Sequence, residues 1–201
     1  STFLVAFEQI QPEYAAFRKS VVHNDVNDNN IIVEDELIQP SVRSIIDYGD
    51  AVKTQTINDV AITLAYAIMG KEDPIAAAVE VLRGYHKQLP LLEEELAVLH
   101  TLVAMQLTIT VTKAAMNTIA EPENEYHQIS EKPAWEALEK WIDLHPELAA
   151  CHFRKACGFD AHENLNSFKS FGSSNQCSVK ILFPTLQFEQ VENVDMSVGS
   201  T

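Results

Sequence analysis

Four polar side chains near the start of the sequence have the types and the order that phosphoryl transfer requires. The stretch VVHNDVNDNNIIV places His23, Asp25 and Asn30 between two apolar runs, and IIDYGD places Asp47 after a third run. Phosphoryl transfer needs a carboxylate that accepts the proton of the attacking hydroxyl, and oxygen ligands for magnesium. Asp25 supplies the first, and Asn30 and Asp47 supply the second, in the order H-x-D-x-x-x-x-N followed by D-aromatic-G. The pattern therefore predicts the catalytic and metal loops of a nucleotide-dependent phosphotransferase.

A loop rich in Asn and Asp also has a simpler interpretation. Such side chains bond to their own backbone and tolerate left-handed conformations, so between two strands they most often form an ordinary turn. The segment NDNN alone would be interpreted in that way. The joint occurrence of HND, NDNN and IIDYGD, in this order and with these flanking runs, favours the phosphotransferase loop.

Three short strands are predicted to hold the two loops. SVV, NIIV and VRSIID are β-branched runs that surround loops 23–30 and 47–56. They predict a small hairpin-like patch and not a large sheet.

Helices are predicted for most of the remaining chain up to Gly158. Residues 3–18 have apolar side chains at helical spacing, and Pro12 is expected to interrupt or restart that helix. Further boundaries are an N-cap at Asn58 with a stop at Gly70, an N-cap at Asp73 before Pro74, a long central helix over 91–120, and one or two helices up to Gly158. Trp135 and Trp141 are predicted core residues. The expected class is α+β and mostly helical.

The acidic composition excludes some classes of partner. Lys and Arg number 14 against 29 Asp and Glu, and the formal net charge of −15 repels phosphate backbones and anionic membranes. We therefore expect no nucleic acid and no membrane as partner. A cationic small substrate suits this charge, although most acidic surfaces only keep a protein soluble. The three cysteines have no framework spacing, which predicts reduced thiols and a cytoplasmic location.

HNDVNDNNIIV and IIDYGDAV resemble the catalytic and metal-binding loops of the aminoglycoside-phosphotransferase and choline-kinase group of protein-kinase-like enzymes. With DVAITLAYAI and PENEYHQISEKPAWEALEKW, the chain is most similar to hydroxylysine kinases. It is also similar to kinase-like segments that some bacterial proteins fuse to peptidase-like and class III aminotransferase domains. The resemblance covers residues 3–158 and implies the carboxyl-terminal lobe of a protein-kinase-like fold. Residues 159–201 are expected to be a linker and the start of a following domain.

The resemblance also implies roles for individual residues. Asp25 matches the catalytic base, His23 its supporting histidine, and Asn30 and Asp47 the ligands of Mg²⁺ that binds with ATP or GTP. Asp59 matches a position that supports the catalytic loop. Four further carboxylates are weaker candidates for contacts with the substrate: Asp28, Asp50, Glu123 and Glu125.

The chain also departs from that group. Asn24 stands where many relatives have Gly, and Tyr48 where Phe or Trp is common. The chain has 6 Gly and no G-x-G-x-x-G, so the phosphate-covering loop, the phosphate-holding lysine and its partner glutamate of the amino-terminal lobe cannot be placed. We therefore expect a carboxyl-terminal lobe without the amino-terminal lobe, and a fragment that is inactive alone.

The expected function is that of an intact parent that transfers the γ-phosphate of ATP or GTP to the hydroxyl of a small cationic amino alcohol such as hydroxylysine. The alternative is a non-catalytic structural or dimerisation module of a multidomain protein that contains an aminotransferase. The intact set of Asp25, Asn30 and Asp47 argues against that alternative. Without the amino-terminal lobe, an apolar patch is expected near the strand pair, which would favour a homodimer.

Overall fold

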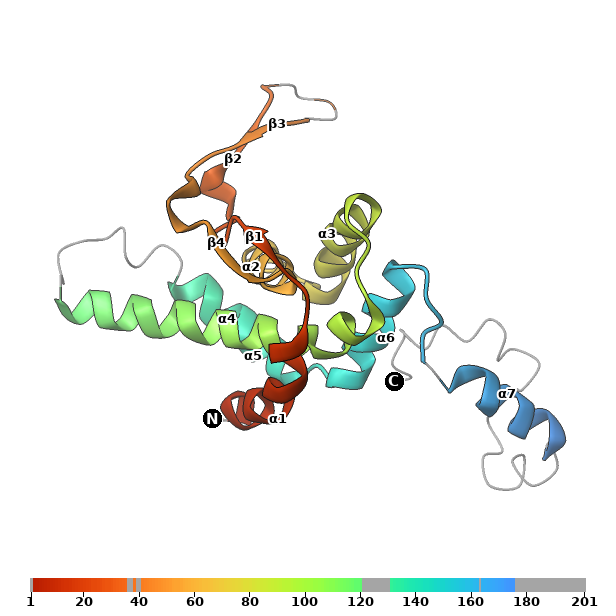
Figure 1. Cartoon of the computed structure of the whole chain (residues 1–201). Helices are drawn as coiled ribbons and strands as arrows, with labels where there is room; N and C mark the ends of the chain where they lie inside the picture. The colour runs from red at the N-terminus through yellow and green to blue at the C-terminus, as the bar shows by residue number, and fades with distance from the viewer. Residues whose placement is uncertain (1, 36–37, 39–40, 121–130, 163, 176–201) are drawn as a thin grey trace.

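The structure, a computed structural model, describes residues 2–35, 38, 41–120, 131–162 and 164–175. Its elements, in chain order, are α1 (Thr2–Ala16), β1 (Lys19–Val22), the 3-10 turn η1 (Asp28–Asn30), β2 (Ile31–Val33), β3 (Val42–Ile45), the 3-10 turn η2 (Tyr48–Asp50), β4 (Val52–Gln55), α2 (Ile57–Ala67), α3 (Pro74–Gln88), α4 (Glu93–Ala120), α5 (Glu131–Asp143), α6 (Pro146–Ala156) and α7 (Leu165–Ser174) (Figure 1). The mostly helical α+β class is thereby confirmed.

Helix α4 is the centre of the bundle, as predicted. It packs against α1, α2, α5 and α6, and its side chains Leu96, Leu99, Val103 and Leu107 are fully buried. Among the described residues it is also the one helix with the length and apolar composition of a membrane span, but 56% of its apolar window is buried inside the protein. Packing in the bundle therefore accounts for its composition. The carboxyl-terminal end of α4 extends beyond the other helices, where Ile119 is 81% exposed (Figure 1).

Of four predictions about helix ends and breaks, two were wrong and two were confirmed. Helix α1 is not interrupted at Pro12. Proline has no backbone N–H, so the carbonyl four residues earlier has no helical donor, but Pro12 is exposed and water can bind there instead. Helix α2 begins at Ile57, so Asn58 is not its N-cap. Asp73 does cap α3, because its Oδ1 accepts a hydrogen bond of 3.0 Å from the backbone N–H of Ala76. Gly70 has a φ of 69°, which suits a glycine that ends a helix.

The strands form two separate antiparallel pairs. β1 pairs with β4, with Lys19 opposite Gln55, and β2 pairs with β3, with Ile31 opposite Ile45. Strand β4 was missed, because VKTQ has no run of β-branched residues and was assigned to a loop. Residues 23–51 connect β1 to β4, so the pairing of these two strands brings both ends of this segment together. The two polar loops therefore lie at the same end of α2 (Figure 1).

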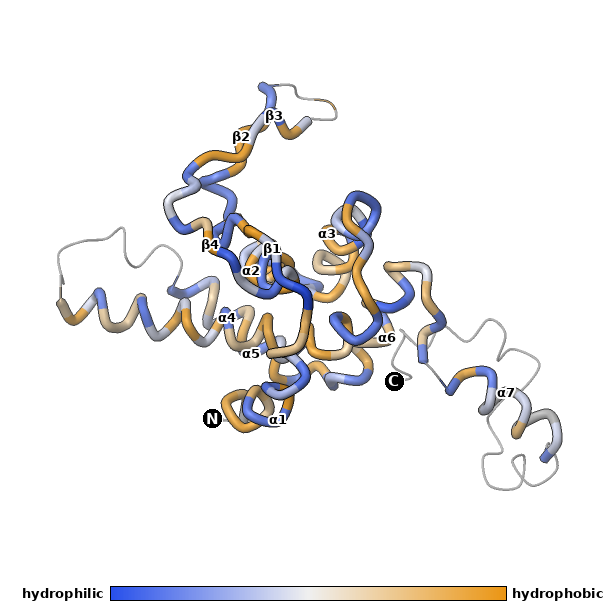
Figure 2. Tube along the Cα trace, in the orientation of Figure 1, coloured by the Kyte–Doolittle hydropathy of each residue, from blue (hydrophilic) through white to orange (hydrophobic). Residues whose placement is uncertain are grey.

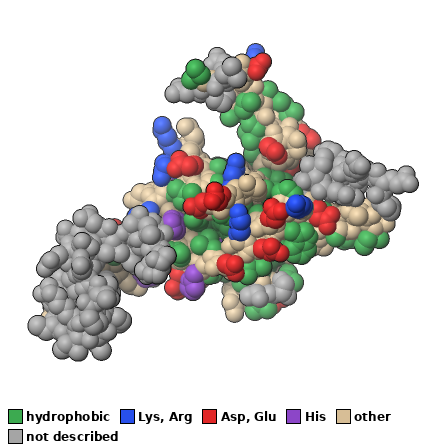
Figure 3. All heavy atoms as spheres, turned by 180° about the vertical axis from the view of Figure 1, so that it is seen from behind, with side chains coloured by type: hydrophobic (Ala, Val, Ile, Leu, Met, Phe, Trp, Pro, Cys, Tyr) green, Lys and Arg blue, Asp and Glu red, His purple; other side chains and the backbone are tan. Residues whose placement is uncertain are grey.

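The β2–β3 hairpin extends away from the helices, and its apolar side chains are exposed. Val42 is 63% exposed and Val33 55%, and Ile45 and Ile46 are exposed as well. Strand β2 is hydrophobic along its length (Figure 2), and hydrophobic side chains cover the stem of the hairpin (Figure 3). The expected apolar patch is therefore present, whereas the homodimer stays a prediction.

Two further expectations meet the structure in part. Trp141 is fully buried, but Trp135, on the same helix α5, is 47% exposed and is not a core residue. The segment predicted as a linker contains helix α7. Residues 176–201, expected to include the start of a following domain, lie outside the described residues.

Candidate active site

His23 connects the two polar loops. The backbone N–H of Asp25 donates to His23 Nδ1 at 3.4 Å, and His23 Nε2 lies 2.8 Å from the carbonyl oxygen of Ile46. Because Nδ1 accepts, Nε2 carries the proton and donates to Ile46, which makes the ring a neutral tautomer. The ring also packs against Tyr48, with 4.7 Å between the ring centroids. One buried side chain thus fixes the distance between the loop that carries Asp25 and the loop that carries Asp47.

Asp25 and Asn30 contact each other directly. Asn30 is buried, and its Nδ2 donates to Asp25 Oδ2 at 3.1 Å and to the Asp25 carbonyl oxygen at 2.9 Å. Asn27 Nδ2 donates to the same Oδ2 at 3.1 Å, while its Oδ1 caps η1 by accepting from the N–H of Asn29. The Asn30 amide therefore turns its nitrogen toward Asp25, and its oxygen points to the other side of the group.

Asp59 binds the start of the loop that carries Asp25. It lies in the first turn of α2, and its Oδ1 accepts a hydrogen bond of 3.2 Å from the backbone N–H of Asn24. Asn24 has a φ of 67°, in the left-handed region that Gly adopts without strain and Asn tolerates best among other residues. This explains why Asn can occupy a position where the resembling family often has Gly.

Asp47 is held in a left-handed conformation too. Its φ is 63° and its ψ is 70°, and its Oδ1 accepts from the N–H of Gly49 at 3.4 Å. A Cβ at Gly49 would lie only 3.3 Å from that carboxylate oxygen. In the described part of the chain, Asn24 and Asp47 are the two non-glycine residues with positive φ, and strained backbone of this kind is concentrated at functional sites.

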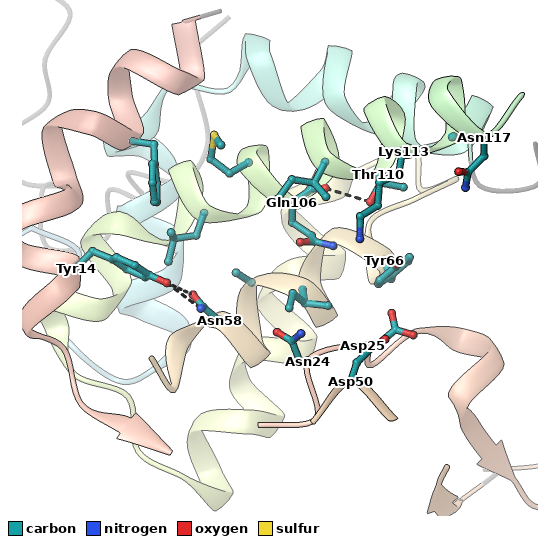
Figure 4. Close-up of a pocket in the computed structure, with 17 residues that line it drawn as sticks. Tyr14, Asn24, Asp25, Asp50, Asn58, Tyr66, Gln106, Thr110, Lys113 and Asn117 are labelled. Atoms are coloured by element: carbon teal, nitrogen blue, oxygen red, sulfur yellow. Dashed lines mark hydrogen bonds between the residues drawn. The ribbon is translucent and has the colours of Figure 1, made fainter. Parts of the chain in front are cut away.

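A cavity of about 670 Å³ opens beside Asp25, between α1, α2 and α4 (Figure 4). Its volume lies within the range of small-molecule sites. The polar and charged residues that line it are Tyr14, Asn24, Asp25, Asp50, Asn58, Tyr66, Gln106, Thr110, Lys113 and Asn117. Asn30 and Asp47 do not line it. Asp50, which follows Asp47 in the same loop, does line it, so the cavity reaches both polar loops.

Tyr66 lies close to Asp25 in the lining of the cavity (Figure 4). Burial raises the pKa of Tyr66, and the nearby carboxylates of Asp25 and Asp28 raise it further, whereas Thr110 lowers it. The phenol therefore stays protonated at neutral pH and remains a hydrogen-bond donor beside Asp25. Sequence reasoning missed Tyr66, although it follows Asp59 by seven residues and therefore shares its helix face.

The structure brings some of the weaker candidates to the cavity and not others. Asp50 lines the cavity. Asp28 is exposed in η1 and does not line it, but its charge raises the pKa of Tyr66. Glu123 and Glu125 lie outside the described residues. Lys113 lines the cavity and was also missed, although its spacing from Gln106 and Thr110 on an apolar helix is visible in the sequence.

The donor atoms of Asn30 and Asp47 suit a hard cation. Both offer oxygen, which is what Mg²⁺ binds in proteins. Two protein oxygens leave most of an octahedral shell to phosphate oxygens and water, as at the metal sites of nucleotide-dependent enzymes. In the described part of the chain, no group of three or more His, Cys, Asp and Glu residues could hold a metal ion by itself.

Comparisons with known proteins agree with this geometry. The model of a phosphotransferase enzyme family matches residues 3–102. The chain is 32% identical to hydroxylysine kinase of Xenopus laevis over 145 residues, 69% of this chain and 39% of that protein. It is 29% identical to hydroxylysine kinase of Mus musculus over 143 residues, 68% of this chain and 38% of that protein. No solved structure gives a significant match.

The matched region contains both polar loops and the histidine that connects them. Residues 3–102 include both polar loops, the two strand pairs, helix α2 and the first part of α4. The chain spans less than half the length of the curated relatives that it matches. With the family model, the relatives and the paired loops in agreement, residues 3–102 of the chain belong to the phosphotransferase enzyme family.

Proposed function

We propose that this chain is the catalytic lobe of a small-molecule kinase, a protein-kinase-like carboxyl-terminal lobe that acts with an amino-terminal lobe outside the chain. The observation that carries the proposal is the connection of two loops through His23, which positions Asp25 and Asn30 against the loop of Asp47. Membership of the phosphotransferase family and the partial coverage of the hydroxylysine kinases support it.

In the proposed reaction, Asp25 accepts the proton of the acceptor hydroxyl. The hydroxyl oxygen forms a bond to the γ-phosphorus, the bond from that phosphorus to the bridging oxygen breaks, and the nucleoside diphosphate leaves with the bond electrons. Asn30 and Asp47 would hold Mg²⁺, which would neutralise charge on the phosphates of ATP or GTP. The bonds from Asn27 and Asn30 to Asp25 Oδ2 fix the orientation of the carboxylate that accepts this proton.

The cavity beside Asp25 is the proposed acceptor site. Asp25 lines this cavity, whereas Asn30 and Asp47 do not, so we assign the acceptor to the cavity and the metal and nucleotide to Asn30 and Asp47. Asp50 in its lining suits an ammonium group. The relatives named hydroxylysine kinase suggest a hydroxylated amine such as hydroxylysine as the acceptor.

The alternative function is a structural module of a larger protein, beside peptidase-like and aminotransferase domains. The exposed apolar hairpin β2–β3 favours it, because such a surface is typically covered by another domain or a second copy. The alternative module is non-catalytic, so an assay of phosphoryl transfer distinguishes the two functions.

The test is release of nucleoside diphosphate by the full-length polypeptide that contains this sequence, with Mg²⁺, with ATP or GTP, and with hydroxylysine and other amino alcohols. Loss of a catalytic base costs about 10²- to 10⁴-fold, so we expect Asp25→Asn to reduce acceptor-dependent release by at least 100-fold. Asp35→Asn makes the same chemical change at an exposed residue outside the cavity and should leave the rate unchanged. A folded wild-type protein that releases no diphosphate with any acceptor would favour the structural module.

A further inference from the structure

Helix α4 carries a polar stripe on its face toward the cavity. Gln106, Thr110, Lys113 and Asn117 are separated by four, three and four residues, so they lie on one side of the helix. All four line the cavity, and they lie across it from Asp25 (Figure 4). An apolar helix that places its polar residues on one wall of a cavity offers that wall to a polar ligand.

Lys113 supplies the positive charge of this wall. The charged residues of the lining are Asp25, Asp50 and Lys113, so the cavity has two carboxylates and one ammonium group. Lys113 is exposed, and within the described residues no carboxylate forms an ion pair with it. The charges therefore suit a ligand that has an ammonium group near Asp50 and an anionic group near Lys113.

The position of Lys113 also indicates which substrate it meets. Lys113 shares the cavity lining with Asp25 and Asp50, whereas the two residues proposed to hold the metal, Asn30 and Asp47, do not line it. Tyr66 and Thr110 lie between Lys113 and Asp25, where they provide polar groups along the wall (Figure 4). A ligand that fills this space can present a hydroxyl to Asp25 while its far end reaches Lys113.

We propose that Lys113 binds the carboxylate of the acceptor, so that the substrate class is hydroxy amino acids and not amino alcohols that lack a carboxylate. This inference rests on the proposed function, because it assumes that the cavity holds the acceptor of the phosphoryl group. It adds a residue that determines specificity at the end of the cavity opposite the reacting hydroxyl.

The experiment compares two acceptors that differ only in the carboxylate, hydroxylysine and its decarboxylated counterpart 1,5-diaminopentan-2-ol. The full-length polypeptide is assayed as wild type and as Lys113→Met, Lys113→Arg and Lys87→Met, the last being an exposed lysine outside the cavity. A hydrogen bond between charged groups is worth enough to change affinity about 10- to 100-fold. We expect Lys113→Met to raise KM for hydroxylysine by that factor and to leave KM for the diamino alcohol and the nucleotide unchanged. Lys113→Arg should retain most of the preference, and Lys87→Met all of it.

Calorimetric binding of the two acceptors without nucleotide separates this inference from the proposed function. Hydroxylysine that binds more tightly than the diamino alcohol, and loses that advantage in Lys113→Met, supports the carboxylate contact even if no turnover occurs. Equal binding of both acceptors by the wild type, or no binding of either, overturns it. A raised KM for the nucleotide in Lys113→Met also overturns it, because the lysine would then serve the phosphates.

Discussion

His23 has a different partner on each ring nitrogen, and both partners are backbone groups of the candidate site. Its Nδ1 accepts from Asp25 and its Nε2 donates to Ile46, while Tyr48 covers the ring. The sequence motif identifies His23 as part of the loop but says nothing of Ile46, which follows it by 23 residues. The histidine thus acts through position, because it keeps the two loops in register.

At this residue scale, we expect His23→Ala to lower kcat without a comparable change in KM for the acceptor. The substitution removes the hydrogen bond to the Ile46 carbonyl, and because Ile46 is exposed that carbonyl can bind water instead, so we expect a loss of about 0.5–1.5 kcal/mol of stability. It also lets the loops of Asp25 and Asp47 move apart. Steady-state kinetics of the full-length polypeptide and urea unfolding of this chain measure the two effects. An unchanged kcat in a folded variant would contradict the positioning role.

Helix α4 begins at a buried ion pair that connects it to the junction of α1 and β1. Arg18 Nε and Nη2 donate to the two carboxylate oxygens of Glu95, each at 2.8 Å, and Nη2 also donates to the Pro90 carbonyl at 2.7 Å. Glu95 Oε2 accepts from the backbone N–H of Leu92 as well, as the glutamate of a capping box does. The Glu95 hydrogen bond raises the pKa of Arg18, against a smaller opposing effect of burial. Strand β1 is thereby fixed to the end of the central helix.

At the scale of the element, we expect Arg18→Met to destabilise the chain strongly. The Glu95 side chain is 1% exposed and would be left as an unpaired buried carboxylate, whereas Arg18 is 35% exposed. Removal of one partner of a buried pair costs about 3–5 kcal/mol, and the partial exposure of Arg18 places the expected loss near 3 kcal/mol. Urea unfolding gives the value. The double variant with Glu95→Met should recover part of the loss, and a double variant as unstable as the sum of both single variants would argue against the pair.

His100 joins three helices in the core of the molecule. Its Nε2 lies 3.2 Å from the Trp141 carbonyl oxygen, Trp141 Nε1 donates to the His100 carbonyl at 3.0 Å, and the two rings stack 5.3 Å apart. Phe3 of α1 packs on the same imidazole at 6.2 Å. Burial lowers the pKa of His100, the carbonyl of Trp141 opposes that shift, and His145 adds to it. The stability of the whole bundle is therefore linked to the protonation of one histidine.

At the scale of the whole molecule, we expect the free energy of unfolding to fall as the pH decreases below about 6.5, the ordinary pKa of histidine. The pKa of His100 is lower in the folded than in the unfolded protein, so between the two values the unfolded state binds more protons. The contribution is fully present above pH 6.5 and is lost toward the folded pKa. Urea unfolding of this chain at pH 7.5 and 5.5 tests this. His100→Gln should reduce the difference between the two pH values, and an undiminished difference would contradict the assignment.

The sequence predicted the helices better than the strands, because the residues that begin and end a helix lie within a few positions of each other along the chain. Helix α3 has its cap at Asp73 and its proline at the first position, and these signals lie within a few residues. Strand β4 has no such signal, because VKTQ is extended only through its pairing with β1. Asn58 had the type of a cap, but its side chain bonds instead to Tyr14 of α1, a contact that the local sequence does not reveal.

The sequence alone was enough to predict the two polar loops. His23, Asp25, Asn30 and Asp47 have the types and the order that phosphoryl transfer needs, and both can be read along the chain. Only the tertiary structure decided what surrounds them. The pairing of β1 with β4 aligns the loops, α2 brings Tyr66 to Asp25, and α4 brings Lys113 to the far wall of the same cavity. Residues that recognise a substrate come from separate elements, and their meeting depends on how helices pack and not on any spacing along the chain.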